Sequence, residues 1–147
     1  AGEPWKAQYW VREVMDRMYT PTPDGYCGDE DNGQTSAWYV FSAMGFYPVA
    51  PGTDEYALGS PLFKKVTVNL ENGKKLVIDA PANSETNRYI DRMTVNGKVY
   101  DKNYITYPMI MDGAVIDVKM SDKPNLERGT KEADFPYSFS NELKGKK

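Results

Sequence analysis

The sequence contains no histidine and a single cysteine, Cys27. Without histidine, the Ser-His and Cys-His pairs of many hydrolases, histidine general bases and the usual zinc sites are excluded. A single cysteine cannot form a disulfide within the chain, and it says little about the redox compartment. Any catalytic chemistry must therefore rest on carboxylates, tyrosines or lysines.

The sequence also lacks a basic surface and a long apolar run. The formal net charge is −3, which provides no field to attract nucleic acid. There is no run of about 18 apolar residues, the length that a membrane-spanning helix needs. With 147 residues, 40% hydrophobic and 27% charged, the composition predicts one soluble globular domain. No signal-peptide pattern opens the sequence, as expected of a cytosolic protein or of a piece of a longer chain.

Lysine and arginine are absent between residues 18 and 63, a stretch that holds six acidic residues: Asp24, Asp29, Glu30, Asp31, Asp54 and Glu55. One interpretation is a solvated acidic face. The other is a site for a cation, for the hydroxyls of a sugar or for proton transfer. Composition leaves both open.

Two amphipathic helices are predicted at the start of the chain. The first runs from Pro4 to about Tyr19, with helical spacing at Val11, Val14, Met15 and Met18. The second runs from about residue 33 to 44, with the same spacing at Ala37, Val40, Phe41 and Met44. Asp31 and Gln34 predict a capping box at its start, and Gly45 predicts its end. The densest acidic cluster therefore falls in the loop between the helices.

After residue 48 the pattern becomes that of a small antiparallel sheet. Three dipeptides favour tight turns: Asn72-Gly73, Asn96-Gly97 and Asp112-Gly113. The hairpins expected across the first two turns join residues 66–70 to 75–79 and residues 93–95 to 98–100. Residues 114–120 alternate as a further strand.

The chain is therefore predicted to be an α+β protein in three segments. These are the helices with the acidic loop over residues 1–48, the antiparallel β domain over 49–120 and an irregular tail over 121–147. One core is expected to bury the apolar strand residues Val66, Val68, Leu76, Ile78, Val95, Ile116 and Val118. The β domain either binds carbohydrate through exposed rings such as Tyr89, Tyr100, Tyr104 and Tyr107, or only supports the rest of the protein.

The loop from Gly28 to Gln34 is where chemistry is expected. If the loop is extended, Asp29 and Asp31 project to one side, roughly 6–7 Å apart. Their repulsion raises one pKa unless a cation, a donor or a helix N-terminus intervenes. An ionised carboxylate held beside a polar pocket can act as a general base on water. The alternative for Asp31 is helix capping. An EF-hand is excluded because, with Asp29 as position 1, Gly33 and Val40 would fall where oxygen ligands are required.

The block from Gly28 to Pro48, GDEDNGQTSAWYVFSAMGFYP, closely resembles the last characteristic block of glycoside hydrolase family 92. The segment Gly2–Lys6 is similar to the family's segment before its penultimate helix. The segment Tyr56–Phe63 is similar to its link into a terminal β domain. The resemblance covers about residues 1–120. Members of this family are exo-acting α-mannosidases, mainly α-1,2, of glycan-degrading bacteria.

The resemblance implies a longer, secreted or periplasmic parent protein. Its fold would combine an N-terminal β-sandwich, an (α/α)₆ catalytic barrel that ends with the two predicted helices, and closing β-strands. It would remove mannose from glycans with inversion, using a glutamic general acid, carboxylate bases and a calcium ion that contacts the sugar.

The resemblance also implies roles for residues of this chain. Asp31 is the first choice as base, Asp29 shares or supports that role, and Glu30 and Trp5 would contact the substrate. The general acid and the calcium ligands would lie upstream of Ala1, so no metal ligand is assigned here. The isolated chain is therefore expected to be inactive.

Overall fold

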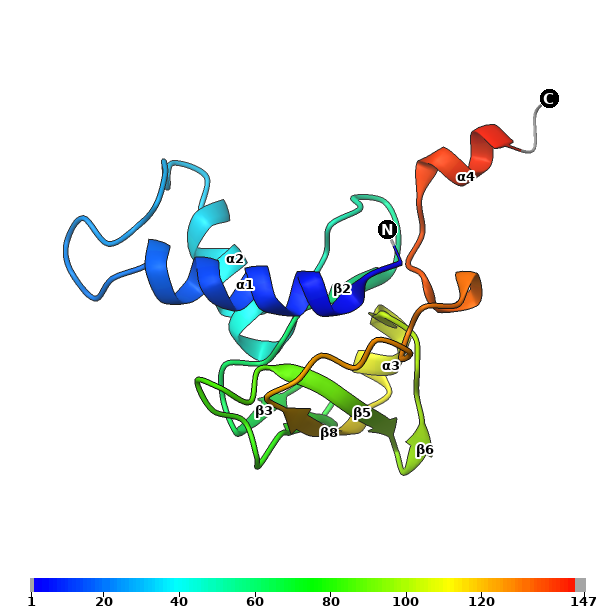
Figure 1. Ribbon diagram of the computed structural model, residues 1–147. Helices are drawn as coiled ribbons and strands as arrows, with labels where there is room; N and C mark the ends of the chain where they lie inside the picture. The colour runs from blue at the N-terminus through cyan, green and yellow to red at the C-terminus, as the bar shows by residue number, and fades with distance from the viewer. Residues whose placement is uncertain (1, 145–147) are drawn as a thin grey trace.

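The computed structural model describes residues 2–144, which form a mixed α+β fold with two β-sheets and four α-helices. Helix α1 (Pro4–Met18) lies alongside the sheets, and α2 (Gln34–Met44) crosses behind it toward them (Figure 1). Both predicted helices are confirmed. Gly45 ends α2 at φ +107°, with its N–H donating to the carbonyls of Phe41 and Ser42, because glycine adopts this left-handed conformation without steric cost.

The buried face of α1 differs from the predicted apolar stripe. Met15 is buried as expected, but Met18 is exposed, and the other buried residues of the helix are Gln8 and Arg12. These two polar residues meet backbone groups of the sheet and its loops, so the helix docks through hydrogen bonds as well as through apolar contact.

A three-stranded antiparallel sheet connects the helical part to the rest. Its order is β1-β2-β7, formed by β1 (Phe46–Tyr47), β2 (Glu55–Leu58) and β7 (Tyr104–Thr106). Strand β1 falls inside the predicted helical segment 1–48 and pairs with β2 from the predicted β segment. Strand pairing therefore crosses the predicted boundary between the two segments at residue 48.

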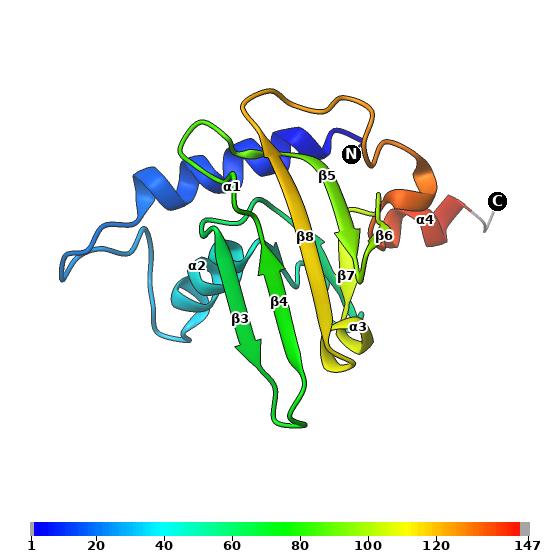
Figure 2. The same ribbon diagram turned by 90° about the horizontal axis from the view of Figure 1, so that it is seen from below.

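The second sheet has five strands in the order β3-β4-β8-β5-β6 (Figure 2). Its members are β3 (Lys65–Asn69), β4 (Lys75–Asp79), β5 (Tyr89–Val95), β6 (Lys98–Val99) and β8 (Ala114–Ser121). Both predicted hairpins are confirmed, with Val68 opposite Leu76 in the first and Val95 opposite Lys98 in the second. Asn96 and Gly97 have φ of 50° and 77°, as a two-residue hairpin turn requires.

The prediction of a purely antiparallel domain is wrong for one strand pair. Strand β8 runs parallel to β4, with Ile78 opposite Ile116, while it runs antiparallel to β5. The third turn dipeptide, Asp112-Gly113, does not form a hairpin. It ends the short helix α3 (Tyr107–Met111), where the Gly113 N–H donates to the Ile110 carbonyl, and leads into β8. Strand β8 thereby enters between β4 and β5.

One hydrophobic core lies between the two sheets, as predicted. Leu76, Ile78, Ile116 and Val118 are buried in it, and Val66, Val68 and Val95 pack against it half-buried. The three-stranded sheet contributes Phe46 and Ile105, and α2 contributes Phe41 and Met44. Because residues from both sheets and α2 share this core, the end of α2 is held rigidly against the sheets.

The predicted tail is more ordered than expected. Buried Arg128 donates to the carbonyls of Tyr100 and Lys102, both at 3.1 Å, and Asn125 donates to the Asp91 carbonyl at 2.9 Å. A 3₁₀ turn (Glu132–Asp134) and α4 (Phe139–Lys144) follow. Residues 145–147 of that predicted tail lie outside the described residues.

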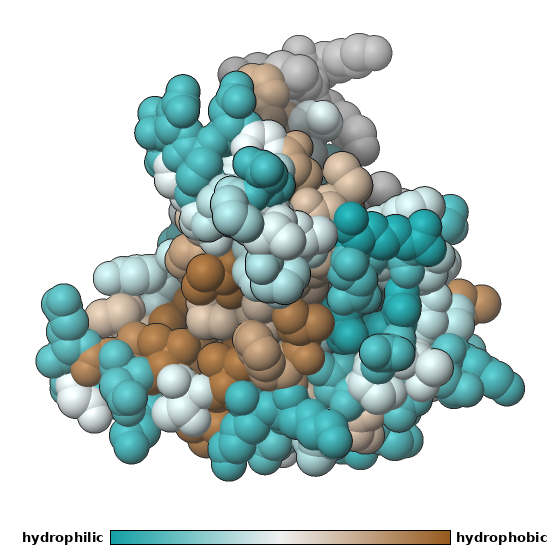
Figure 3. All heavy atoms as spheres, turned by 90° about the vertical axis from the view of Figure 1, so that its left-hand side faces the viewer, coloured by the Kyte–Doolittle hydropathy of each residue, from teal (hydrophilic) through white to brown (hydrophobic). Residues whose placement is uncertain are grey.

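The helices expose several large apolar side chains: Trp10 is 62% exposed, Met18 52% and Val40 55%. Figure 3 shows apolar side chains gathered on the face at the loop end of the molecule. Phe41, Met44 and Met15 are covered by the packing described above, so only part of each predicted apolar face is buried. Within residues 2–144, no helix is long and apolar enough to cross a membrane.

This exposure predicts that the 147-residue chain associates when made alone, because apolar patches above a few hundred Å² are unusual on monomers. Light scattering coupled to size exclusion should show a molecular mass that rises with protein concentration. Val40→Lys should weaken this association. Val115→Lys is the matched control, since Val115 is also exposed but lies on the polar side of β8. A concentration-independent monomer would contradict the prediction.

Candidate functional site

The acidic loop projects from the end of the molecule where α1 ends and α2 begins (Figure 1). The carbonyl of Glu30 accepts a hydrogen bond from the Gly33 N–H at 2.9 Å, so residues 30–33 form a turn and the loop is not extended beyond Glu30. Gly33 has φ +70°, a conformation that favours glycine. Asp31 therefore lies in the turn itself, immediately before the helix.

Asp29 and Asp31 are both exposed. Neither carboxylate accepts a hydrogen bond from another of the residues 2–144, so both are free to meet a ligand or water. Asp29 borders a hollow of about 350 Å³, together with Cys27, Thr35 and Trp38. The two predicted base residues thus lie exposed in the same loop, one on each side of Glu30 in the sequence.

The predicted capping box is wrong: the N-cap of α2 is Gly33, a residue without a side chain to cap the helix. The carboxylate that binds the helix is that of Glu30, which accepts from the Ser36 backbone N–H at 2.9 Å and from the Ser36 hydroxyl. These bonds from Ser36 lower the pKa of Glu30. The carboxylate therefore stays ionised against the positive end of the helix.

Thr35 connects the acidic loop to the end of α1. Its buried side-chain hydroxyl donates to the Asp29 carbonyl at 3.0 Å, and its own carbonyl accepts from the Tyr19 hydroxyl at 3.1 Å. Tyr19 stacks on Trp38 with ring centroids 5.7 Å apart. Burial raises the pKa of Tyr19 to about 12, so its hydroxyl keeps the proton it donates. Sequence reasoning missed Thr35 and Ser36, although hydroxyl residues in a first helical turn were the available signal.

A second hollow, of about 480 Å³, is also lined by Tyr19. Its lining combines aromatic and small residues, among them Tyr19, Tyr26, Tyr39, Pro21 and Val40. The Tyr26 hydroxyl lies 3.0 Å from that of Ser36. Flat rings beside an ionised loop are the kind of surface that meets the apolar faces of sugars.

Trp5 is not brought to this loop. It lies in the first turn of α1, at the end of the helix opposite the acidic loop (Figure 1). The thirteen residue-to-residue steps from Trp5 to Met18 span about 20 Å of helix. The substrate contacts proposed for Trp5 and for Glu30 stay predictions.

A buried polar cluster ties α1 to the loops of the five-stranded sheet. Arg12 is only 3% exposed and donates to the Pro61 carbonyl and to Asn83 Oδ1, each at 2.9 Å, and to the Ser84 carbonyl at 3.3 Å. Gln8 Oε1, one turn earlier, accepts from the Ile90 N–H at 3.0 Å. Loss of solvent lowers the pKa of Arg12, a cost that its hydrogen-bond acceptors offset.

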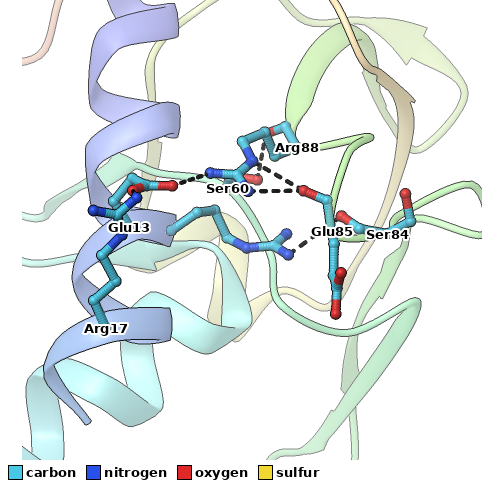
Figure 4. Close-up of polar contacts among 7 residues, drawn as sticks. Glu13, Arg17, Ser60, Ser84, Glu85 and Arg88 are labelled. Atoms are coloured by element: carbon cyan, nitrogen blue, oxygen red, sulfur yellow. Dashed lines mark hydrogen bonds and ion pairs between the residues drawn. The ribbon is translucent and has the colours of Figure 1, made fainter.

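Arg88 completes this cluster from the sheet side. Figure 4 shows its guanidinium between Glu13 of α1 and the Glu85 backbone. It pairs with Glu13 at 2.5 Å and donates to the Glu85 carbonyl, while its own carbonyl accepts from Ser60. Helix α1, which leads directly into the acidic loop, is thereby fixed in orientation relative to the sheet. Gln8, Arg12 and Met15 are spaced so that they share one face of α1. A search for apolar residues alone does not detect this buried face, because two of its three residues are polar.

The calcium ion implied by the resemblance stays a prediction. Among residues 2–144, no three His, Cys, Asp or Glu side chains group closely enough to hold a metal ion. In the acidic loop, the carboxylate of Glu30 is already bound to Ser36.

The chain belongs to glycosyl hydrolase family 92: residues 1–122 match the family's catalytic domain. It is similar to the solved structure of a family 92 inverting mannosidase from Bacteroides thetaiotaomicron VPI-5482, with 55% identity over 95% of this chain and a TM-score of 0.89. A second family 92 α-mannosidase from B. thetaiotaomicron is 46% identical over 94% of this chain, with a TM-score of 0.88. The resemblance found in the acidic block is confirmed.

The chain spans 19% of the length of each of these structures. It also spans 19% of a protein described as an uncharacterized secreted glycosidase from the fungus Arthroderma benhamiae, to which it is 27% identical over 98% of its own length.

Proposed function

We propose that this chain is the C-terminal part of an exo-acting α-mannosidase that hydrolyses mannose-containing glycans with inversion. Its acidic loop supplies the general base. The observation that carries the proposal is the pair of free carboxylates, Asp29 and Asp31, at the exposed end of the α1–α2 hairpin. The 55% identity to an inverting mannosidase supports the reaction class.

In this reaction Asp31 accepts a proton from water while the water oxygen bonds to the anomeric carbon. The bond from that carbon to the glycosidic oxygen breaks, and a general acid outside this chain protonates the leaving oxygen. Inverting hydrolases hold the two carboxyl groups about 6.5–9.5 Å apart to admit the water. Asp29 and Asp31 lie two residues apart in one loop, so neither acts as the acid across the sugar.

The remaining parts of the proposal concern the longer protein. Helices α1 and α2 would close an (α/α)₆ barrel, and the other barrel helices would cover the exposed Trp10, Met18 and Val40. We also propose that the longer protein has an N-terminal β-sandwich and prefers α-1,2 linkages. It would depend on calcium held by ligands outside residues 2–144, and it would be located in the periplasm or at the cell surface. The match to a secreted glycosidase supports export.

A direct test assays the full-length protein and the 147-residue chain on α-1,2-mannobiose, with proton NMR of the first mannose released. The full-length protein should release β-mannose, the inverted product, and lose activity on chelation of calcium. The chain alone should release none. Release of α-mannose, or no hydrolysis of any mannoside by the full-length protein, would refute the proposal.

For the β domain we propose a supporting role in place of carbohydrate binding. Of Tyr89, Tyr100, Tyr104 and Tyr107, only Tyr107 is exposed. Tyr100 is half-buried, donates to the Tyr104 carbonyl at 2.8 Å and has its pKa raised to about 12 by burial. A sugar platform would need two or three of these rings exposed together. The Arg12 cluster instead gives the domain a means of bracing α1.

Truncating Tyr104 and Tyr107 to Ala in the full-length protein should therefore lower thermal stability and leave turnover per folded molecule unchanged. Most of the loss should come from Tyr104, because Tyr107 is 51% exposed; Tyr107→Ala alone is the control. Calorimetry and assays on small and polymeric mannosides decide the matter. Weaker capture of large mannans with intact stability would favour the carbohydrate-binding role.

A further inference from the structure

The loop that carries Asp29 and Asp31 is fastened to the helix that follows it by its middle residue. Both carboxylate oxygens of Glu30 are bound by Ser36, one by the backbone N–H and one by the hydroxyl. Ser36 is the third residue of α2, where the N–H has no partner inside the helix. A side chain held in this way is turned toward the first turn of α2.

Two further bonds fix the backbone on either side of that anchor. The Asp29 carbonyl accepts a hydrogen bond from the hydroxyl of Thr35, a residue that is only 7% exposed. The Glu30 carbonyl accepts one from the Gly33 N–H. Tyr19, just past the end of α1, donates to the Thr35 carbonyl and so fixes the same point from the other helix.

These bonds fix the backbone of residues 29–31 to the first turn of α2 and engage none of the Asp29 and Asp31 carboxylate oxygens. General-base catalysis depends on holding the carboxylate within hydrogen-bond reach of the attacking water. A misplacement of about 1 Å can cost about 100-fold in rate. The fastening therefore supplies the precision that two exposed carboxylates on a projecting loop would otherwise lack.

We propose that Glu30 and Thr35 are positioning residues, which hold Asp29 and Asp31 in place for catalysis, and that Glu30 does this instead of contacting the substrate. This inference rests on the proposed function, because it requires that the two aspartates act on the reacting water. It departs from the expectation that Glu30 binds the sugar.

The test uses the full-length protein and measures kcat and KM separately. Thr35→Val removes only the hydroxyl bond to Asp29 and keeps the shape of the side chain. Glu30→Gln removes the charge and one acceptor. Each should lower kcat by about 10–100-fold with KM changed less than about twofold, the pattern of an interaction that matters only in the transition state. Thr35→Ser restores the hydroxyl and should recover most of the rate.

Ser36→Ala and Glu30→Gln should not be additive, because they break the same contact. Thermal unfolding of each variant provides the check that the full-length protein is folded. If Glu30→Gln fails to fold, Thr35→Val and its rescue by Thr35→Ser carry the test alone.

Three results would overturn the inference. A raised KM with kcat retained in Glu30→Gln would make Glu30 a substrate contact. Unchanged kcat in folded Thr35→Val and Glu30→Gln would show that the fastening has no catalytic effect. Equal losses of kcat in Thr35→Ser and Thr35→Val would show that the hydrogen bond from the Thr35 hydroxyl to the Asp29 carbonyl does not contribute to catalysis. The aspartate variants separate this failure from failure of the proposed function: if Asp29→Asn and Asp31→Asn both keep full turnover, there is no base to position and both proposals fail.

Discussion

Asp31→Asn in the full-length protein is expected to lower kcat by on the order of 10²–10⁴-fold, because an amide cannot accept the proton of the attacking water. The Asp31 side chain is exposed and accepts no hydrogen bond from other residues in the range 2–144, so its replacement should leave the fold intact. Asp29→Asn is expected to fall in the same range if the two carboxylates share the role. Initial rates on a small mannoside, with circular dichroism to show folding, measure both effects.

Asp24→Asn is the matched control, since Asp24 is an exposed acidic residue of the same interhelical loop that lies before the Glu30 anchor. It should retain wild-type turnover. Near-wild-type rate in Asp31→Asn combined with an inactive Asp29→Asn would move the base to Asp29. Full activity in both would remove the general base from this loop altogether.

Arg12→Met should destabilise the 147-residue chain by about 2–4 kcal/mol, the range expected when a buried charge that makes several hydrogen bonds is removed. Methionine fills a similar volume, but it leaves Asn83 Oδ1 without its donor in a buried site. The Pro61 carbonyl keeps a donor, because Asn83 Nδ2 also binds it at 3.0 Å. The midpoint of thermal unfolding should drop by about 5–15 °C for a chain of this size.

Arg17→Met is the control for that prediction. Arg17 lies on the same helix and pairs with Glu13 at 2.7 Å, but its side chain is 74% exposed, and exposed ion pairs contribute about 0–1 kcal/mol. Arg12→Lys should behave like Arg12→Met, because the single nitrogen of an ammonium cannot reach the acceptors that the two terminal nitrogens of the guanidinium bind separately. A small effect of Arg12→Met would mean that the cluster does not brace α1.

Local patterns in the sequence were sufficient to predict the two long helices and the two hairpins. The apolar spacing around Met15 and Phe41 and the turn residues Asn72-Gly73 and Asn96-Gly97 each act within a few residues of the chain. The parallel pairing of β4 with β8 could not be obtained in this way. Ile78 and Ile116 are far apart in sequence, and nothing in either strand specifies which neighbour it meets.

The acidic loop shows the same limit at smaller scale. The location of the loop followed from composition and resemblance, and the hydrogen bonding inside it did not. Asp31 was expected to cap α2, but Gly33 takes the cap position with φ +70°, and the Ser36 N–H binds Glu30. Glu30 and Asp31 are neighbours of similar chemistry, so only the backbone path decides which one reaches Ser36.

The insertion of β8 between β4 and β5 has a consequence for the order in which the chain can assemble during synthesis. Strands β4 and β5 belong to successive hairpins, yet each pairs with β8 and they do not pair with each other. Residues 65–99 therefore leave the ribosome as two hairpins that no strand yet joins. Isolated hairpins are marginally stable, and their open edges can pair with other chains. The sheet is complete only after Ser121 has emerged, so between these points the nascent chain carries the unpaired edges of β4 and β5.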